Sequence, residues 1–195
     1  MLALDVLPPP AQVLSERMDG LAEILHGNVN LAVWQRRLPA SVDRFAQAVL
    51  EQGIDLAEAL TLPIEQEDTA CPPVALTRLA GRAAHLAGHD AFIADVDHLV
   101  SAFACLFDVR TVGLRLRTLD TGMCPRWHVD HVPVRLITSY AGPGSQWLEE
   151  SQLSRRHLGG PAVQVAPGAT QAQSLAAGDV ALLKGERWQG NEGRG

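Results

Sequence analysis

The sequence predicts an α+β protein, and two regularities along the chain support that prediction. Up to about residue 107 most apolar residues recur at helical spacing, whereas from residue 108 onward several segments alternate apolar and polar residues. Runs of helices followed by runs of strands indicate an α+β architecture, with the strands folded as a jelly-roll-like barrel. Over 195 residues we expect a single domain, with a mainly helical part at 1–107 and a mainly β part at 108–195.

The composition argues against several classes of protein. Apolar residues make up 47% and charged residues 19% of the chain, as in folded rather than disordered proteins. The net charge of −6 gives no electrostatic reason to expect binding to nucleic acid or to anionic lipid. No apolar run approaches the ~20 residues of a membrane span. Three scattered cysteines without a Cys-x-x-Cys pair, and a start without a basic region, predict a cytoplasmic protein.

The first 62 residues are predicted to form two helices and at least one strand. Ser15 is suited to cap a helix whose apolar residues recur as far as Leu25, and Ser41 is suited to cap a second helix that ends near Leu50. Between them, residues 29–35 alternate in the manner of a strand. The segment 54–62 fits either a short strand or a helical turn.

Two longer helices are predicted next, at 74–86 and 91–107, with Asp90 as the N-cap of the second. His85 and His89 are four residues apart, a spacing that zinc-binding helices use, but no Glu follows His85. We therefore interpret them as histidines that face the negative end of the first helix dipole.

The remaining chain is predicted to be rich in strands. Residues 111–119 alternate clearly, 162–165 and 179–184 are shorter strands, and 124–144 supplies one or two more. After the 179–184 strand, the charged residues Lys184, Glu186 and Arg187 are placed to reach the rim of a pocket, which Trp188 would close.

His128 and Asp130 are the strongest candidate metal ligands. On a strand, residues i and i+2 leave the same face, about 6.6 Å apart at Cα, and can converge on one ion. His-x-Asp is thus two thirds of a two-His-one-carboxylate site, which leaves coordination positions open on Fe(II). The simpler interpretation is a His–Asp pair at a strand edge whose members bond each other or the backbone.

Neighbouring residues allow a second set of ligands. Cys124 and His131, added to His128 and Asp130, would give a zinc site with sulfur, nitrogen and oxygen donors, although the spacing matches no strong zinc template. Arg135 is placed to bind a carboxylate, as a cofactor-binding residue, with an ordinary surface arginine as the alternative.

Two blocks of sequence resemble the DUF1826 family of bacterial proteins: Arg126 to Trp147, which contains Trp-His-Val-Asp-His-Val-Pro, and Gly178 to Trp188, which contains Lys-Gly-Glu-Arg-Trp. The similarity extends from about Asn30 to the end of the chain. The family has no established activity, and its occurrence in zinc-responsive gene clusters implies a link to zinc homeostasis.

The His-x-Asp block also resembles the 2-oxoglutarate/Fe(II) dioxygenase superfamily. That resemblance implies a double-stranded β-helix, iron and 2-oxoglutarate as cofactors, and a distal His on a late strand that completes the triad. The sequence has no His in that position, and His157 falls in a polar loop. We therefore expect the barrel and the triad to be truncated in this chain, and Arg135 does not occupy the usual position of the 2-oxoglutarate anchor. Whether the chain is an enzyme, a metal-binding accessory protein or a catalytically silent domain stays open, as do its substrate and its oligomeric state.

Overall fold

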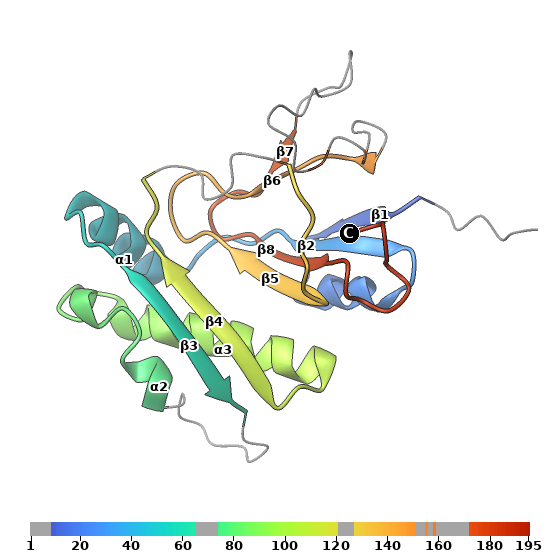
Figure 1. Cartoon of the computed structure of the whole chain (residues 1–195). Coiled ribbons are helices and arrows are strands. Elements are labelled where there is room, and N and C mark those ends of the chain that lie inside the picture. Colours follow the sequence, from blue (N-terminus) through green and yellow to red (C-terminus); the bar gives the residue numbers. More distant parts are fainter. Residues whose placement is uncertain (1–8, 65–73, 121–126, 151–154, 156–157, 159–171) are drawn as a thin grey trace, which may run out of the picture. The chain divides into compact units, whose positions relative to one another are not determined.

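The computed structural model describes residues 9–64, 74–120, 127–150, 155, 158 and 172–195 (Figure 1). Helices and strands are both present in quantity, so the predicted α+β class is confirmed. The chain divides into two compact units. One is formed by Met1–Arg37 with Cys124–Gly195, and the other by Leu38–Met123.

The first unit is built on a four-stranded sheet with the strand order β1-β2-β8-β5. β1 (Ala11–Ser15) runs parallel to β2 (Val29–Trp34). β8 (Val180–Lys184) is antiparallel to β2 on one side and to β5 (Val134–Thr138) on the other. The strands predicted at 29–35 and 179–184 are therefore confirmed and lie side by side at the centre of this sheet.

The two central strands are apolar on both faces because both faces are covered. On one face Leu31, Val33 and Ala181 form a buried cluster with Leu175, against which Ile137, Trp147 and Leu183 pack. The alternation of a strand places Ala32, Val180 and Leu182, which are fully buried, on the other face. The 3-10 helix η1 (Met18–Leu25) packs against the sheet and buries Leu21 and Ile24.

The prediction for Ser15 is wrong in one respect. Ser15 ends β1, a strand that was not predicted, and the helix that follows begins after Arg17 without a side-chain cap. The Ser15 hydroxyl still accepts a hydrogen bond from the Arg17 amide at 3.0 Å. The helical spacing of the apolar residues up to Leu25 was interpreted correctly, but the helix is of the 3-10 type.

The second unit packs one long helix against a two-stranded antiparallel sheet, and two further helices pack against that helix (Figure 1). The sheet pairs β3 (Ala57–Pro63) with β4 (Thr111–Arg117), so the ambiguous segment 54–62 contains a strand. The helices are α1 (Ala40–Glu51), α2 (Val74–Thr77), η2 (Gly81–Ala83) and α3 (His89–Phe107). α1 buries Val42, Phe45, Ala46 and Val49.

Four expectations for the second unit are wrong. α1 begins directly after Pro39, so Ser41 lies in its first turn and is not the N-cap. The predicted helix at 74–86 is broken into α2 and η2, with Ala80 in the left-handed region at φ 53°. α3 begins after Gly88, whose φ of 95° suits glycine, so Asp90 lies inside the first turn and is not the N-cap. His85 and His89 do not share a helix end, because His89 opens α3 and is buried whereas His85 is exposed.

The described strands form three separate open sheets. β6 (Gln146–Trp147) and β7 (Gln173–Ser174) make the third, and the expected strand at 162–165 lies outside the described residues. Within the described ranges no sheet closes on itself, so the jelly-roll-like barrel stays a prediction. None of the helices seen in those ranges is long and apolar enough to cross a bilayer.

Candidate functional site

The candidate ligands His128 and Asp130 lie in the segment that leads into β5. The expected strand over them is wrong, because residues 127–130 have no regular structure and residues 131–133 form a bend. Pro133 explains this, since it lacks the N–H that a regular ladder would need. The pair is nevertheless close, with His128 Nε2 3.9 Å from Asp130 Oδ1.

The turn after β8 holds this segment in place. The Gly185 amide donates to the Pro133 carbonyl oxygen at 2.9 Å, and the Glu186 amide donates to the Asp130 carbonyl oxygen at 2.8 Å. These bonds continue the β5–β8 pairing past the end of β5. A Cβ on residue 185 would overlap the backbone of Val132 and Asp130, so only glycine permits this approach. No local pattern in the sequence indicated this contact.

The carboxylate of Asp130 lies between two side chains. Arg135, on β5, forms an ion pair in which its Nε lies 2.9 Å from Asp130 Oδ2. The other oxygen, Oδ1, is the one near His128. The side chain of Asp130 is 16% exposed, against 47% for His128 and 46% for Arg135, so the carboxylate is the buried member of the group. Arg135 thus meets a carboxylate of the protein itself, and its role as a cofactor-binding residue stays a prediction.

The spacing of His128 and Asp130 nearly fits one metal ion. Two donors that each lie about 2.1 Å from an ion, at tetrahedral or octahedral angles, are about 3.0–3.4 Å apart. The observed 3.9 Å is therefore too wide by about 0.5 Å for tetrahedral angles and about 0.9 Å for octahedral angles, so the two side chains would have to approach each other to share an ion. Among the described residues no group of three or more His, Cys, Asp or Glu side chains is arranged to hold a metal ion.

The other candidate ligands are less well placed. His131 follows Asp130 directly and is exposed. Cys124 lies outside the described residues, as does Arg126, so the alternative zinc set of Cys124, His128, Asp130 and His131 stays a prediction.

Lys184, which the sequence placed at the rim of a pocket, is buried instead. Lys184 is 3% exposed, and its Nζ donates to the His26 carbonyl oxygen at 2.6 Å and lies 4.9 Å from the centre of the Trp188 ring. Burial, and then the charge of Arg194, lower the pKa of Lys184. Glu186 accepts hydrogen bonds from the Gly193 and Gly195 amides, so it stabilises the turn that follows β8.

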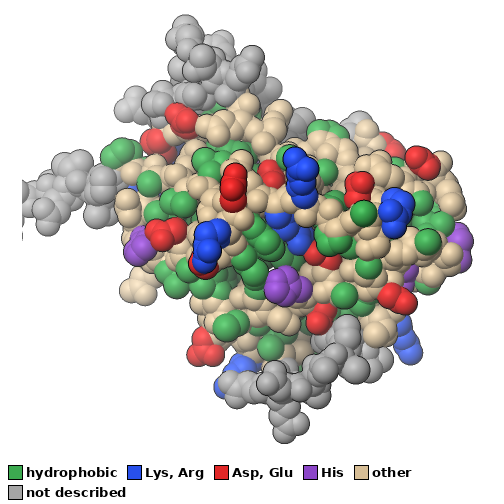
Figure 2. All heavy atoms as spheres, turned by 180° about the vertical axis from the view of Figure 1, so that it is seen from behind, with side chains coloured by type: hydrophobic (Ala, Val, Ile, Leu, Met, Phe, Trp, Pro, Cys, Tyr) green, Lys and Arg blue, Asp and Glu red, His purple; other side chains and the backbone are tan. Residues whose placement is uncertain are grey.

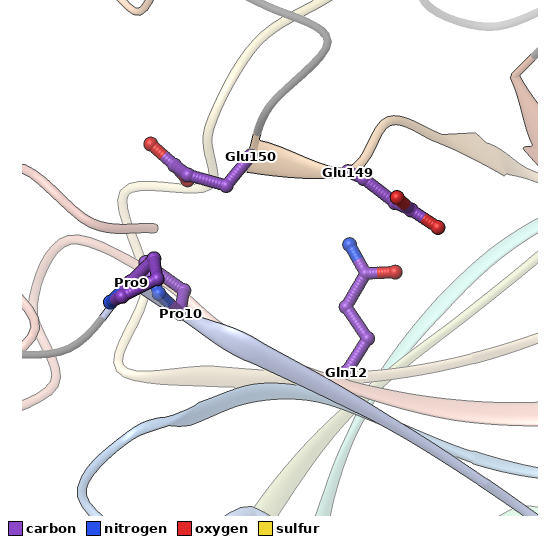
Figure 3. A pocket seen from close by; sticks show the side chains of 5 residues that line it. All are labelled: Pro9, Pro10, Gln12, Glu149 and Glu150. Carbon is purple, nitrogen blue, oxygen red and sulfur yellow. The ribbon is translucent and has the colours of Figure 1, made fainter. Parts of the chain in front are cut away.

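An open groove of about 400 Å³ lies elsewhere in the first unit, lined by Pro9, Pro10, Gln12, Glu149 and Glu150 (Figure 3). Gln12 projects from β1 toward the segment that carries the two glutamates (Figure 3). Both carboxylates already have partners: Arg155 forms an ion pair with Glu150 at 2.6 Å, and Gln173 donates to Glu149 at 2.8 Å. The groove therefore offers no uncompensated ligand group.

On the face drawn in Figure 2, charged side chains of one sign do not gather into a patch among the described residues. Figure 2 shows acidic and basic side chains interspersed with apolar ones over the face drawn there. This distribution agrees with a modest net charge of −6.

Comparison with known proteins places the chain in a family. The family model described as "Protein of unknown function (DUF1826)" matches residues 15–195. The chain belongs to the DUF1826 family. No curated protein and no solved structure matches the chain, so neither search supports the resemblance to the dioxygenase superfamily.

Proposed function

We propose that this DUF1826 protein binds a divalent metal ion through His128 and Asp130. The observation that supports the proposal is the approach of His128 Nε2 to Asp130 Oδ1, at 3.9 Å, in a segment fixed by backbone hydrogen bonds from Gly185 and Glu186. A histidine nitrogen and a carboxylate oxygen in this arrangement suit Fe(II) and Zn²⁺ alike.

Within that proposal, the form we favour is a protein of the 2-oxoglutarate/Fe(II) dioxygenase type with a jelly-roll-like barrel. Fe(II) held by histidine and carboxylate keeps coordination positions for a cosubstrate and dioxygen, which is the chemistry the metal supplies when bound. His128 and Asp130 would supply two ligands on one side of the ion. Arg135 would bind the carboxylate of 2-oxoglutarate only by sharing its guanidinium with Asp130, because the two are an ion pair in the structure.

The alternative is a metal-binding accessory protein in zinc homeostasis, which would use the same His128 and Asp130 with Cys124 or His131.

We also propose a cytoplasmic location, since the sequence has only three cysteines and no Cys-x-x-Cys pair. A small-molecule or protein substrate, rather than nucleic acid or membrane, agrees with the net charge of −6 and with the mixed charges on the face drawn in Figure 2.

The test is direct measurement of bound metal. The purified protein is stripped of metal, dialysed against Fe(II) under anaerobic conditions or against Zn²⁺, and analysed by plasma mass spectrometry. We expect about one ion per chain for the wild type and a clear loss for His128→Ala and Asp130→Ala, because each variant removes a ligand. His98→Ala is the matched control: it removes an exposed histidine on α3, in the other unit, and should not change the content.

The identity of the metal separates the two forms of the proposal. Fe(II) binding with metal-dependent consumption of 2-oxoglutarate supports the dioxygenase type. Zn²⁺ binding that Cys124→Ala or His131→Ala abolishes supports the accessory protein. A wild type that retains no more of either metal than the His128→Ala and Asp130→Ala variants would refute both.

A further inference from the structure

We infer that Arg135 is a positioning residue of the metal site, because it holds the carboxylate of Asp130 in the orientation that an ion requires. This inference rests on the proposed metal-binding function. Arg135 Nε lies 2.9 Å from Asp130 Oδ2, and the remaining oxygen, Oδ1, is the one near His128 Nε2. The two carboxylate oxygens thus have separate neighbours, a guanidinium and an imidazole.

Asp130 is restrained at two points, and His128 is more exposed to solvent. The backbone of Asp130 is held by the Glu186 amide at 2.8 Å, and its side chain is held by Arg135. Its side chain is 16% exposed, against 47% for His128. An arriving ion would therefore meet a carboxylate already in place, and the histidine would make the adjustment. Groups that orient a ligand in this way typically contribute 10–100-fold to metal affinity.

A cation next to a metal ligand also repels the metal, and this repulsion opposes the orienting effect. Arg135 is 46% exposed, and water and salt screen its charge at that exposure. The buried cation on the neighbouring strand, Lys184, pairs with Val134 in the register, so its side chain leaves the opposite face from Arg135. Repulsion at the site is thus weak, and we expect the orienting effect to dominate.

The test measures Zn²⁺ affinity by competition with a chelating dye, without 2-oxoglutarate. Arg135→Gln should weaken Zn²⁺ binding by about 10–100-fold. Arg135→Lys keeps the charge but not the planar fork, so it should recover part of the loss. In an Asp130→Asn background, Arg135→Gln should have no further effect, because the carboxylate that Arg135 orients is gone.

The matched control is Arg115→Gln, which removes an exposed arginine from β4 in the other unit and should leave the affinity unchanged. Equal or tighter binding by Arg135→Gln would overturn the inference, as would an equal loss in the Asp130→Asn background.

Circular dichroism shows whether Arg135→Gln folds. If it does not, the Zn²⁺ affinity of Arg135→Lys is compared with that of the wild type, and equal affinity overturns the inference. A wild type that binds no Zn²⁺ or Fe(II) refutes the proposed function itself, whereas a wild type that binds and is insensitive to Arg135 refutes only the positioning role.

Discussion

Gly185 lies directly against Asp130: a Cβ built on the glycine would come within 2.5 Å of the aspartate carbonyl oxygen, closer than real Cβ atoms lie. The backbone of the candidate site therefore depends on the absence of a side chain 55 residues further along the chain.

The Gly185→Ala variant should displace the segment 130–133 from the end of β8. The overlap weakens the hydrogen bonds to the carbonyl oxygens of Pro133 and Asp130, and crowding of this kind costs about 1–3 kcal/mol. Urea denaturation measures the cost, and hydrogen exchange should show faster exchange of the Glu186 amide. Gly113→Ala is the control, because a Cβ at that strand position meets nothing within 4 Å. Unchanged exchange at Glu186 would contradict the prediction.

Lys184 should titrate below its ordinary pKa of 10.5, because burial and the charge of Arg194 both disfavour its protonated form. It is the sole lysine of the sequence, so lysine labelled with carbon-13 and nitrogen-15 gives one side-chain signal that needs no assignment. A chemical-shift titration of that signal measures the pKa directly. A midpoint at or above 10.5 would show that the amine is solvated.

The same lowered pKa predicts how stability depends on pH. The unfolded chain keeps the Lys184 proton to higher pH than the folded chain, so unfolding free energy rises with pH between the folded-state pKa and about 10.5. Lys184→Met removes this contribution. The difference in stability between wild type and variant should therefore grow in favour of the wild type through that alkaline window, as measured by urea denaturation. Parallel pH profiles would count against it.

His89 should stabilise the second unit as a buried residue. Its Nε2 lies 2.8 Å from the Leu79 carbonyl oxygen, and its ring meets the Phe45 ring edge-on at 5.6 Å. His89→Ala leaves a cavity and an unpaired carbonyl group, so we expect a loss of about 2–4 kcal/mol in unfolding free energy. His98→Ala, an exposed change on the same helix, should stay within about 0.5 kcal/mol. Similar losses for the two variants would refute the buried role.

Asp179 should be required for the turn that leads into β8. It is 7% exposed, and its carboxylate accepts hydrogen bonds from the Ala176 amide at 2.8 Å and the Arg36 amide at 3.3 Å. Asp179→Ala leaves two amides without these acceptors, and we expect a lower thermal midpoint, equivalent to about 1–3 kcal/mol. Asp120→Ala, at an exposed position, is the control. Equal midpoints for both variants would show that the carboxylate is dispensable.

The elements that the sequence predicted well are those whose apolar period is set by burial. β2 and β8 are central strands, and α1 and α3 each bury a stripe of residues. β1 was missed because its five residues form an edge strand and Ser15 equally suits a helix cap. The break near Ala80 was missed because alanine seldom adopts a positive φ. An alanine at this position therefore predicted that the helix would continue.

The candidate site was predicted in part for a similar reason. The closeness of His128 and Asp130 was predicted from strand geometry, and the two side chains approach to 3.9 Å although the segment is not a strand. The loss of strand geometry before Pro133, and the support from Gly185 and Glu186, depend on pairing with a distant segment. Tertiary contacts of that range leave no local period in the sequence.

Because the chain is synthesised from its N-terminus, the two units differ in when they can fold. Leu38–Met123 is one continuous stretch, so the second unit can fold as soon as it leaves the ribosome. The first unit cannot, because β2 reaches its neighbour β8 only after roughly 150 further residues have been made. Until then β2 is a nascent apolar strand with an unsatisfied edge, and its early partners are β1 and η1. The His128–Asp130 segment, which depends on the turn after β8, is therefore among the last parts of the protein to take shape.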